Sequence, residues 1–215
     1  MTKLAEPMGK VIWSLLCLCT LMSTNHSPLL CLTYVQALKR LPRMGWLFAG
    51  ITQPESVADH SFVMSWLALL LAEQVNSAYT TQGLTQPLDI AKVAHIALVH
   101  DVAESVLTDL PKRSADLLGK QVKYQAEATA MQQIFQQMPN HAYYIGCWQE
   151  YADAATPEGR LVRDADKLEM IHQALCYEQN GQRNLAEFWQ VQAWHYPASQ
   201  NLFAESCRLR FNHNL

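Results

Sequence analysis

The sequence predicts an all-α protein, and two patterns lead to that prediction. Apolar residues recur at helical spacing through most of the chain from Pro28 onward, and proline, glycine or capping residues separate these runs. No run of alternating β-branched residues argues for a sheet. Half of the 215 residues are hydrophobic and 16% are charged, which is typical of a folded protein with a substantial core and not of a disordered chain.

The boundaries of the expected helices follow from local start and stop signals. Ser56 and Asp89 can act as N-caps, and Pro157 suits the first turn of a helix. The stretch from Pro42 to Trp46 is expected to form a loop because it contains a proline and a glycine. The helices are expected over residues 29–41, 57–75, 90–106, 120–138, 141–152, 157–178, 185–194 and 198–211.

The first 27 residues stand apart from this pattern. Residues 11–22 form an apolar run preceded by Lys3 and Lys10, of a length that suits a signal peptide but not a bilayer-spanning helix. No A-x-A-like cleavage site follows, so a packed extension or a start codon assigned too far upstream is favoured over secretion. We therefore expect an N-terminal extension or linker over residues 1–27, one domain over residues 28–215, and no association with a membrane.

Charge and cysteine usage restrict the partners and the compartment. The net charge of −3 provides no extended basic surface, so a nucleic-acid partner is not expected. A small anionic substrate requires only a local cationic group, and the overall charge does not exclude it. The six cysteines are scattered and form no C-x-x-C pair, which is typical of reduced thiols in a cytoplasmic protein.

The most informative segment places polar groups inside an apolar helical run. His100, Asp101 and Glu104 interrupt residues 94–104, and burying such groups is costly unless a cation or hydrogen bonds compensate. On the expected helix, Glu104 lies beside the other two side chains. Taken alone, the segment is more simply explained as a core histidine with two solvated acids near a helix end.

Two other apolar helices carry further candidate ligands. His60 begins the expected helix 57–75, and Asp166 lies within 157–178. Together with His100 and Asp101 they would supply two imidazoles and two carboxylates, a mixed set that suits Mn²⁺, Fe²⁺, Co²⁺ or Zn²⁺ better than Ca²⁺ or Mg²⁺. Asp164 competes with Asp166, but the two point in nearly opposite directions on a helix, so only one can bind the ion.

The order His, then His-Asp, then Asp, on separate helices, resembles the HD-domain superfamily of metal-dependent phosphohydrolases. A closer likeness is to its 5′-deoxynucleotidase branch, through residues 38–46, 54–60, 98–104, 108–111 and 161–170. The resemblance implies a single helical bundle of the HD-domain type. It also implies a divalent metal ion, Mn, Co, Fe or Zn, with His60, His100, Asp101 and Asp166 as its ligands.

The same resemblance implies roles for four more residues. Glu104 matches the catalytic acid that handles the proton of the attacking water, and Asp109 matches a second acid near the sugar and the reacting phosphate. Arg43 and Trp46 match the loop that contacts the phosphate and sugar of the nucleotide, although in some members they are adjacent and here two residues separate them. The implied substrate is a deoxyribonucleoside 5′-monophosphate, and family members are often homodimers.

Two other functions are compatible with these residues. One is an HD-domain hydrolase of another phosphate compound, such as a nucleoside triphosphate or a phosphonate. The other is a catalytically silent module that senses nucleotides or serves as a scaffold. The complete ligand set together with Glu104 argues against a silent module, because a sensor has no need for a proton-handling acid. His95 and His172 are expected to be structural.

Overall fold

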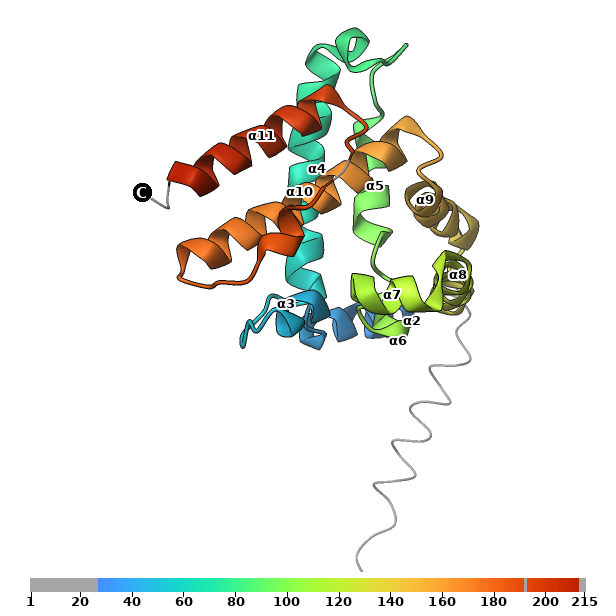
Figure 1. Ribbon diagram of the computed structural model, residues 1–215. Helices are drawn as coiled ribbons and strands as arrows, with labels where there is room; N and C mark the ends of the chain where they lie inside the picture. The colour runs from blue at the N-terminus through green and yellow to red at the C-terminus, as the bar shows by residue number, and fades with distance from the viewer. Residues whose placement is uncertain (1–26, 192, 213–215) are drawn as a thin grey trace, which may run out of the picture.

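The computed structural model describes residues 27–191 and 193–212, and within them the regular secondary structure is helical, without a strand (Figure 1). This confirms the predicted all-α class. The helices are α2 (Pro28–Ala37), η1 (Leu38–Arg40), α3 (Met44–Phe48), α4 (Val57–Ser77), η2 (Tyr79–Gln82), α5 (Ile90–Val99), α6 (Glu104–Leu107), α7 (Lys112–Leu118), α8 (Lys120–Phe135), α9 (His141–Asp153), α10 (Pro157–Gln179), η3 (Ala186–Trp189) and α11 (Pro197–Asn212).

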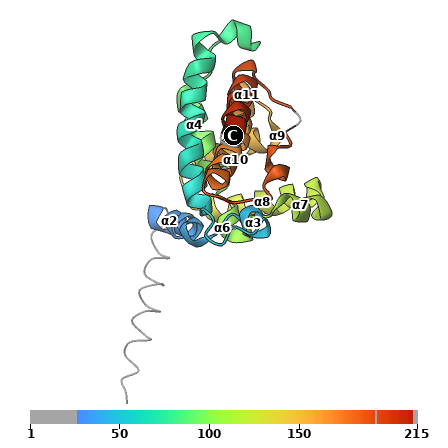
Figure 2. The ribbon, with the colours of Figure 1, turned by 60° about the vertical axis from the view of Figure 1, so that its left-hand side comes forward.

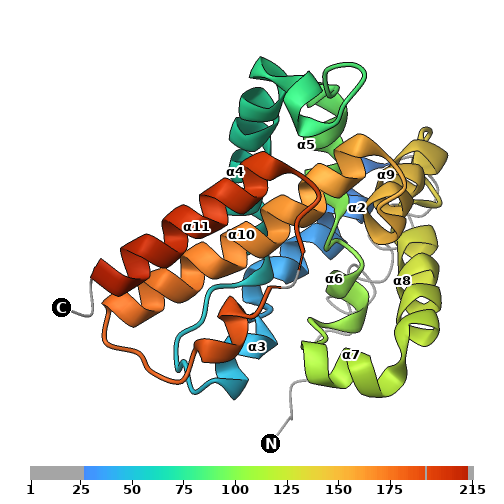
Figure 3. The ribbon, with the colours of Figure 1, turned by 45° about the horizontal axis from the view of Figure 1, so that its top comes forward.

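Helices α4, α5, α9 and α10 pack against one another and enclose the main core. Met64, Ile96, Trp148 and Leu161 are fully buried there, and each such side chain contributes about 1.5–3 kcal/mol through the removal of apolar surface from water. Helix α11 lies along α10 (Figure 3). Because α4, α5 and α10 are held together by this core, polar groups at the edges of these helices acquire fixed relative positions.

Local capping fixes where the two longest helices begin. The Ser56 hydroxyl accepts the Asp59 N–H, and the Asp59 carboxylate accepts the Ser56 N–H, so the predicted N-cap of α4 is confirmed as a capping box. Asp89 caps α5 as predicted, and the Thr156 side chain caps α10 by accepting the Gly159 N–H. A cap of this kind contributes about 1 kcal/mol.

The structure differs from the predicted elements in four places. The helix expected over 90–106 ends at Val99, the chain turns, and the separate short helix α6 begins at Glu104. The expected loop contains α3, a short helix that buries the Trp46 side chain, because burial of one large ring outweighs the weak helix propensity of glycine. Residues 185–194 form only the short 3₁₀-helix η3, and α7 was not expected at all.

The predicted extension over residues 1–27 lies outside the described residues except for Ser27, whose hydroxyl accepts the Leu29 N–H and caps α2. The single domain expected over residues 28–215 stays a prediction. Two groups of buried side chains are joined through Trp194 and Phe203, which pack against both. Among the described helices, none combines the length and the apolar character needed to cross a membrane.

Candidate metal centre

Three helical elements bring the four candidate ligands together. His60 lies in the first turn of α4, His100 ends α5, Asp101 follows in the turn, and Asp166 lies on α10. The Nε2 atom of His60 lies 3.4 Å from Nε2 of His100 and 3.3 Å from Oδ1 of Asp166. The ligand atoms of these three residues all lie within 4.8 Å of one another. Asp101 joins them through its Oδ2 atom, 3.1 Å from Nε2 of His100 and 3.7 Å from Nε2 of His60.

These separations fit a divalent cation. An ion held about 2.0–2.3 Å from each ligand separates neighbouring ligand atoms by roughly 3–3.7 Å. Both side chains reach this point from the end of α5. His100 follows Val99 with helical backbone angles, φ −56° and ψ −42°, and Asp101 lies in the turn that comes next.

Hydrogen bonds at the far nitrogens orient both imidazoles for metal binding. Nδ1 of His100 lies 2.7 Å from the Ala97 carbonyl oxygen, and Nδ1 of His60 lies 2.5 Å from Oε2 of the buried Glu169. A carbonyl or carboxylate oxygen accepts a hydrogen bond here, so Nδ1 donates in each ring, and Nε2 is the nitrogen that faces the cluster. This carboxylate–histidine arrangement is the usual support of a metal-binding histidine.

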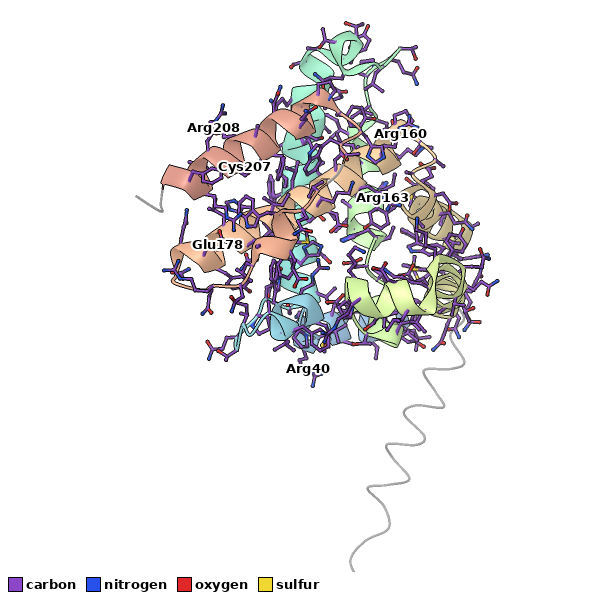
Figure 4. All side chains as sticks on the ribbon, viewed as in Figure 1. Arg40, Arg160, Arg163, Glu178, Cys207 and Arg208 are labelled. Carbon is purple, nitrogen blue, oxygen red and sulfur yellow. The ribbon has the colours of Figure 1, made fainter. Side chains whose placement is uncertain are left out.

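Tyr151 holds Asp166 in a similar way, and Arg163 bonds to the backbone beside Tyr151. The Tyr151 hydroxyl donates to Oδ2 of Asp166 at 2.7 Å, which leaves Oδ1 facing His60. Burial and the nearby Asp166 raise the pKa of Tyr151 well above its usual value, so the phenol stays a donor. Arg163 points from α10 toward the end of α9, where it donates to the Ala152 carbonyl (Figure 4).

Arg43 places a fixed positive charge beside the cluster. Its Nη1 atom lies 3.2 Å from Oδ2 of Asp101. Burial by itself lowers the pKa of Arg43, but Asp101, Asp166 and Asp109 outweigh that effect and raise it. Burial would raise the pKa of Asp101, yet His100, Arg43 and His60 together lower it to about 2. Both groups are therefore charged at neutral pH, and Arg43 is available to an anionic ligand at this position.

Glu104 and Asp109 flank the cluster on the segment after α5. Glu104 is 9% exposed, and its Oε2 atom is one of the buried side-chain atoms in the described chain without a hydrogen-bond partner. Burial, followed by the charges of Asp101 and Asp109, raises the pKa of Glu104 well above its usual value. Asp109 accepts the Met44 N–H at 2.6 Å, which ties this segment to the start of α3. Glu104 thus has an unused oxygen, whereas one oxygen of Asp109 is already occupied.

Trp46 is only 2% exposed, so little of its surface is available to a ligand. Its indole N–H donates to Oε1 of Glu55 at 2.9 Å, and its ring packs against Tyr177 and Phe188. The Glu55 carbonyl in turn accepts the Arg43 N–H at 3.0 Å. A direct contact between Trp46 and a sugar stays a prediction, and these contacts give the residue a second possible role in holding the segment that carries Arg43.

Replacing Trp46 with Phe separates the two roles. We expect the variant to lose about 1–3 kcal/mol of stability, because the partly buried Glu55 side chain loses its hydrogen-bond donor. We expect the ratio of activity on dAMP to activity on AMP to stay unchanged. Thermal unfolding and the two kcat/KM values measure these effects. An unchanged melting temperature with at least about a tenfold change in the ratio would instead assign the ring to sugar recognition.

The other sequence candidates lie outside the cluster. Asp164 is fully buried and accepts the backbone N–H groups of His195 and Tyr196 at 2.9 and 3.2 Å, so it fixes the segment that leads into α11. Only Asp166 of the two competing carboxylates faces the histidines. His95 is bonded to the Tyr143 hydroxyl at 2.8 Å, and His172 lies 3.8 Å from the Cys176 sulfur.

Four supporting residues were not predicted from the sequence: Glu55, Tyr151, Arg163 and Glu169. Only Glu169 had a usable signal: it follows Asp166 by three positions, so both lie on one face of α10. Tyr151 and Glu55 come from other segments, and no spacing in the sequence relates them to the cluster.

Relatives with assigned names resemble this chain over most of its length. The 5′-deoxynucleotidase HDDC2 of Xenopus laevis is 33% identical over 159 residues, covering 73% of this chain and 72% of its own. The 5′-deoxynucleotidase hdd1 of Schizosaccharomyces pombe is 35% identical, covering 70% of this chain and 73% of its own. The 5′-deoxynucleotidase HDDC2 of Homo sapiens is 31% identical over 184 residues, covering 85% of this chain and 77% of its own.

Solved structures show the same fold. A conserved hypothetical protein from Pyrococcus furiosus superposes with a TM-score of 0.70 at 39% identity, covering 83% of this chain and 98% of its own. A predicted metal-dependent phosphohydrolase from Magnetospirillum magnetotacticum superposes with a TM-score of 0.62 and covers 86% of this chain and 89% of its own. Because its sequence is only 22% identical, this likeness supports the fold alone. The sequence model of the HD-domain family matches residues 35–203, well over half of the chain. The chain therefore belongs to the HD-domain family, as the order of its histidines and aspartates indicated.

Proposed function

We propose that this protein is a metal-dependent 5′-deoxynucleotidase, a phosphoric monoester hydrolase that converts deoxyribonucleoside 5′-monophosphates to deoxynucleosides and phosphate. The observation that carries the proposal is the convergence of His60, His100 and Asp166 beside the cationic Arg43. The relatives named as 5′-deoxynucleotidases support the substrate class.

We assign a divalent cation to His60, His100, Asp101 and Asp166. Two imidazole nitrogens and two carboxylates favour Mn, Co, Fe or Zn over Ca²⁺ or Mg²⁺. Such an ion would polarise the phosphoryl group and make a nearby water more acidic. The remaining chemistry belongs to residues of the chain around this centre.

The phosphate dianion is bound by Arg43, whose planar guanidinium can donate two parallel hydrogen bonds to phosphate oxygens. Glu104 accepts a proton from the attacking water through its unpaired Oε2 atom and returns it to the departing 5′-oxygen. The new bond joins the water oxygen to phosphorus, and the bond from phosphorus to the 5′-oxygen breaks. Asp109 contacts a sugar hydroxyl with its remaining acceptor capacity, and Trp46 borders this region.

We further propose a cytoplasmic homodimer that acts on a small-molecule nucleotide. The four cysteines in the described part of the chain are free thiols, which supports a reducing compartment.

A phosphate-release assay with added Mn²⁺ or Co²⁺ tests the function. We expect dAMP and dCMP to be hydrolysed with similar kcat/KM, since no candidate residue is committed to reading a base. AMP should be at least about tenfold poorer, through a clash at the 2′ position, and dATP should be inert. Equal activity on dAMP and AMP would reduce the function to a general nucleotidase. Activity on dATP with none on dAMP would make the protein a triphosphohydrolase.

A further inference from the structure

Tyr177 on α10 is a half-buried polar residue that the proposed mechanism does not use. Its hydroxyl accepts the Glu55 N–H at 2.9 Å, and its ring meets the Trp46 ring edge to face, with the ring centroids 5.2 Å apart. Helix α3 lies below α10 in both Figure 1 and Figure 2, in agreement with this contact. Tyr177 follows Asp166 by eleven positions, about 16 Å along the helix, so the two residues cannot bind the same ion.

The segment between η1 and α4 carries Arg43 and folds back on itself. Pro42 and Ser56 pair as an isolated antiparallel bridge. Beside this bridge, the Arg43 N–H donates to the Glu55 carbonyl at 3.0 Å. Because this bond joins the two backbones directly, a displacement of Glu55 also displaces the start of the Arg43 side chain.

Two side chains from other elements bond to the backbone of this segment. Asp109 accepts the Met44 N–H at 2.6 Å, and Tyr177 accepts the Glu55 N–H. The second contact completes a chain of hydrogen bonds in which the Tyr177 hydroxyl binds the Glu55 N–H and the Glu55 carbonyl binds the Arg43 N–H. The backbone of Arg43 is thereby tied to α10 through one intervening residue.

This tie matters because α10 also carries Asp166. One rigid helix therefore holds a candidate metal ligand near its middle and the Arg43 segment near its C-terminal end. In the proposed function, the metal centre and the Arg43 guanidinium act on the same phosphate group. A planar guanidinium donates two parallel hydrogen bonds only when it is held within about 0.5 Å of the right place, so the separation of these two groups has to be fixed.

We propose that Tyr177 is a positioning residue that holds Arg43 at the phosphate site through the backbone of Glu55. Tyr177 contacts neither the substrate nor the ion in this arrangement, and its effect reaches the phosphate only through Arg43. The inference rests on the proposed function, because it takes a phosphate group as the ligand of Arg43.

Tyr177→Phe tests the proposal, because it keeps the ring against Trp46 and removes only the acceptor of the Glu55 N–H. Titration calorimetry of the Mn²⁺-loaded full chain should show inorganic phosphate bound about tenfold more weakly, less than the roughly hundredfold cost of a full misplacement. The KM for dAMP should rise by a similar factor. The kcat should stay within about twofold, since Arg43 holds the phosphate both before and during the reaction. The metal content should not change.

Tyr196→Phe is the matched control. The Tyr196 hydroxyl donates to the Pro157 carbonyl at the other end of α10, at 2.8 Å, so this variant also loses a tyrosine hydroxyl bond to the backbone. It should unfold at a lower temperature than the unaltered protein and bind phosphate with unchanged affinity. An equal loss of phosphate affinity in both variants would refute the proposal, because general destabilisation would then explain the effect.

A double-mutant cycle shows whether Tyr177 acts through Arg43. Arg43→Met should weaken phosphate binding by at least about tenfold, as expected for a lost charge-assisted hydrogen bond, and adding Tyr177→Phe should weaken it no further. Additive losses, or an unchanged phosphate affinity in Tyr177→Phe alone, would overturn the proposal. A protein whose phosphate affinity depends on both residues, but which hydrolyses no nucleotide, would support the positioning role and refute the proposed function alone.

Discussion

Asp166→Ala is expected to lose its bound metal and at least about a thousandfold in kcat/KM. Weakening a partner that merely orients a ligand costs roughly 10–100-fold in metal affinity or activity, and loss of a ligand itself should exceed that. Asp166 presents Oδ1 to His60 at 3.3 Å, and Tyr151 holds its other oxygen. Elemental analysis of the purified variant and phosphate release from dAMP measure the two effects.

Asp164→Asn is the matched control, because this carboxylate lies two residues away on the same helix. It accepts N–H groups of His195 and Tyr196 and does not contact His60 or His100. We expect it to unfold more easily, by about 1–3 kcal/mol, and to keep its metal. Metal lost from Asp164→Asn but retained in Asp166→Ala would exchange the two assignments.

The metal affinity should also depend on pH. Burial and Arg43 lower the pKa of His60, but the hydrogen bonds of Asp166 and Glu169 outweigh them and raise it to about 9 in the metal-free protein. Metal binding requires the neutral imidazole and so releases this proton. Affinity should therefore rise with pH up to about that value and then level off, which titration calorimetry at several pH values measures.

Glu104→Gln is expected to keep its metal and to lose on the order of a hundredfold or more in kcat, the usual scale for a general acid–base group. The amide preserves size but cannot accept a proton. Burial and neighbouring carboxylates raise the pKa of Glu104, so activity of the unaltered enzyme should fall as the pH drops through that raised value. This acid limb of the pH profile should disappear in the variant.

Glu127→Gln provides the comparison for Glu104→Gln. Glu127 lies on α8, pairs with Lys123 at 3.4 Å, and has no role in the proposed mechanism. Its replacement should change kcat by no more than a few-fold, as for a partly exposed ion pair that touches no reacting group. Near-normal turnover of Glu104→Gln would remove Glu104 from the mechanism, and loss of its metal would make it a ligand.

The sequence by itself determined the helical class, the start of the long helices and the residues that could bind a metal. These features depend on local causes. Apolar side chains at helical spacing select a helix, and the caps Ser56 and Asp89 select where it begins. His60, His100, Asp101 and Asp166 stood out because isolated polar groups in apolar helices are costly without a compensating partner.

Only the tertiary structure decided how these residues meet. Periodicity indicates which face of a helix is buried but not what covers it, so the bond between His60 and Glu169, separated by 109 positions, was not predictable. Likewise, nothing local predicts that His100 and Asp101, at the end of α5, lie beside His60 on α4. Burial of Trp46 in α3 also depends on tertiary contacts, because its ring packs against Tyr177 and Phe188. The free energy gained by burying a large ring exceeds the small differences in helix propensity that favour a loop at this segment.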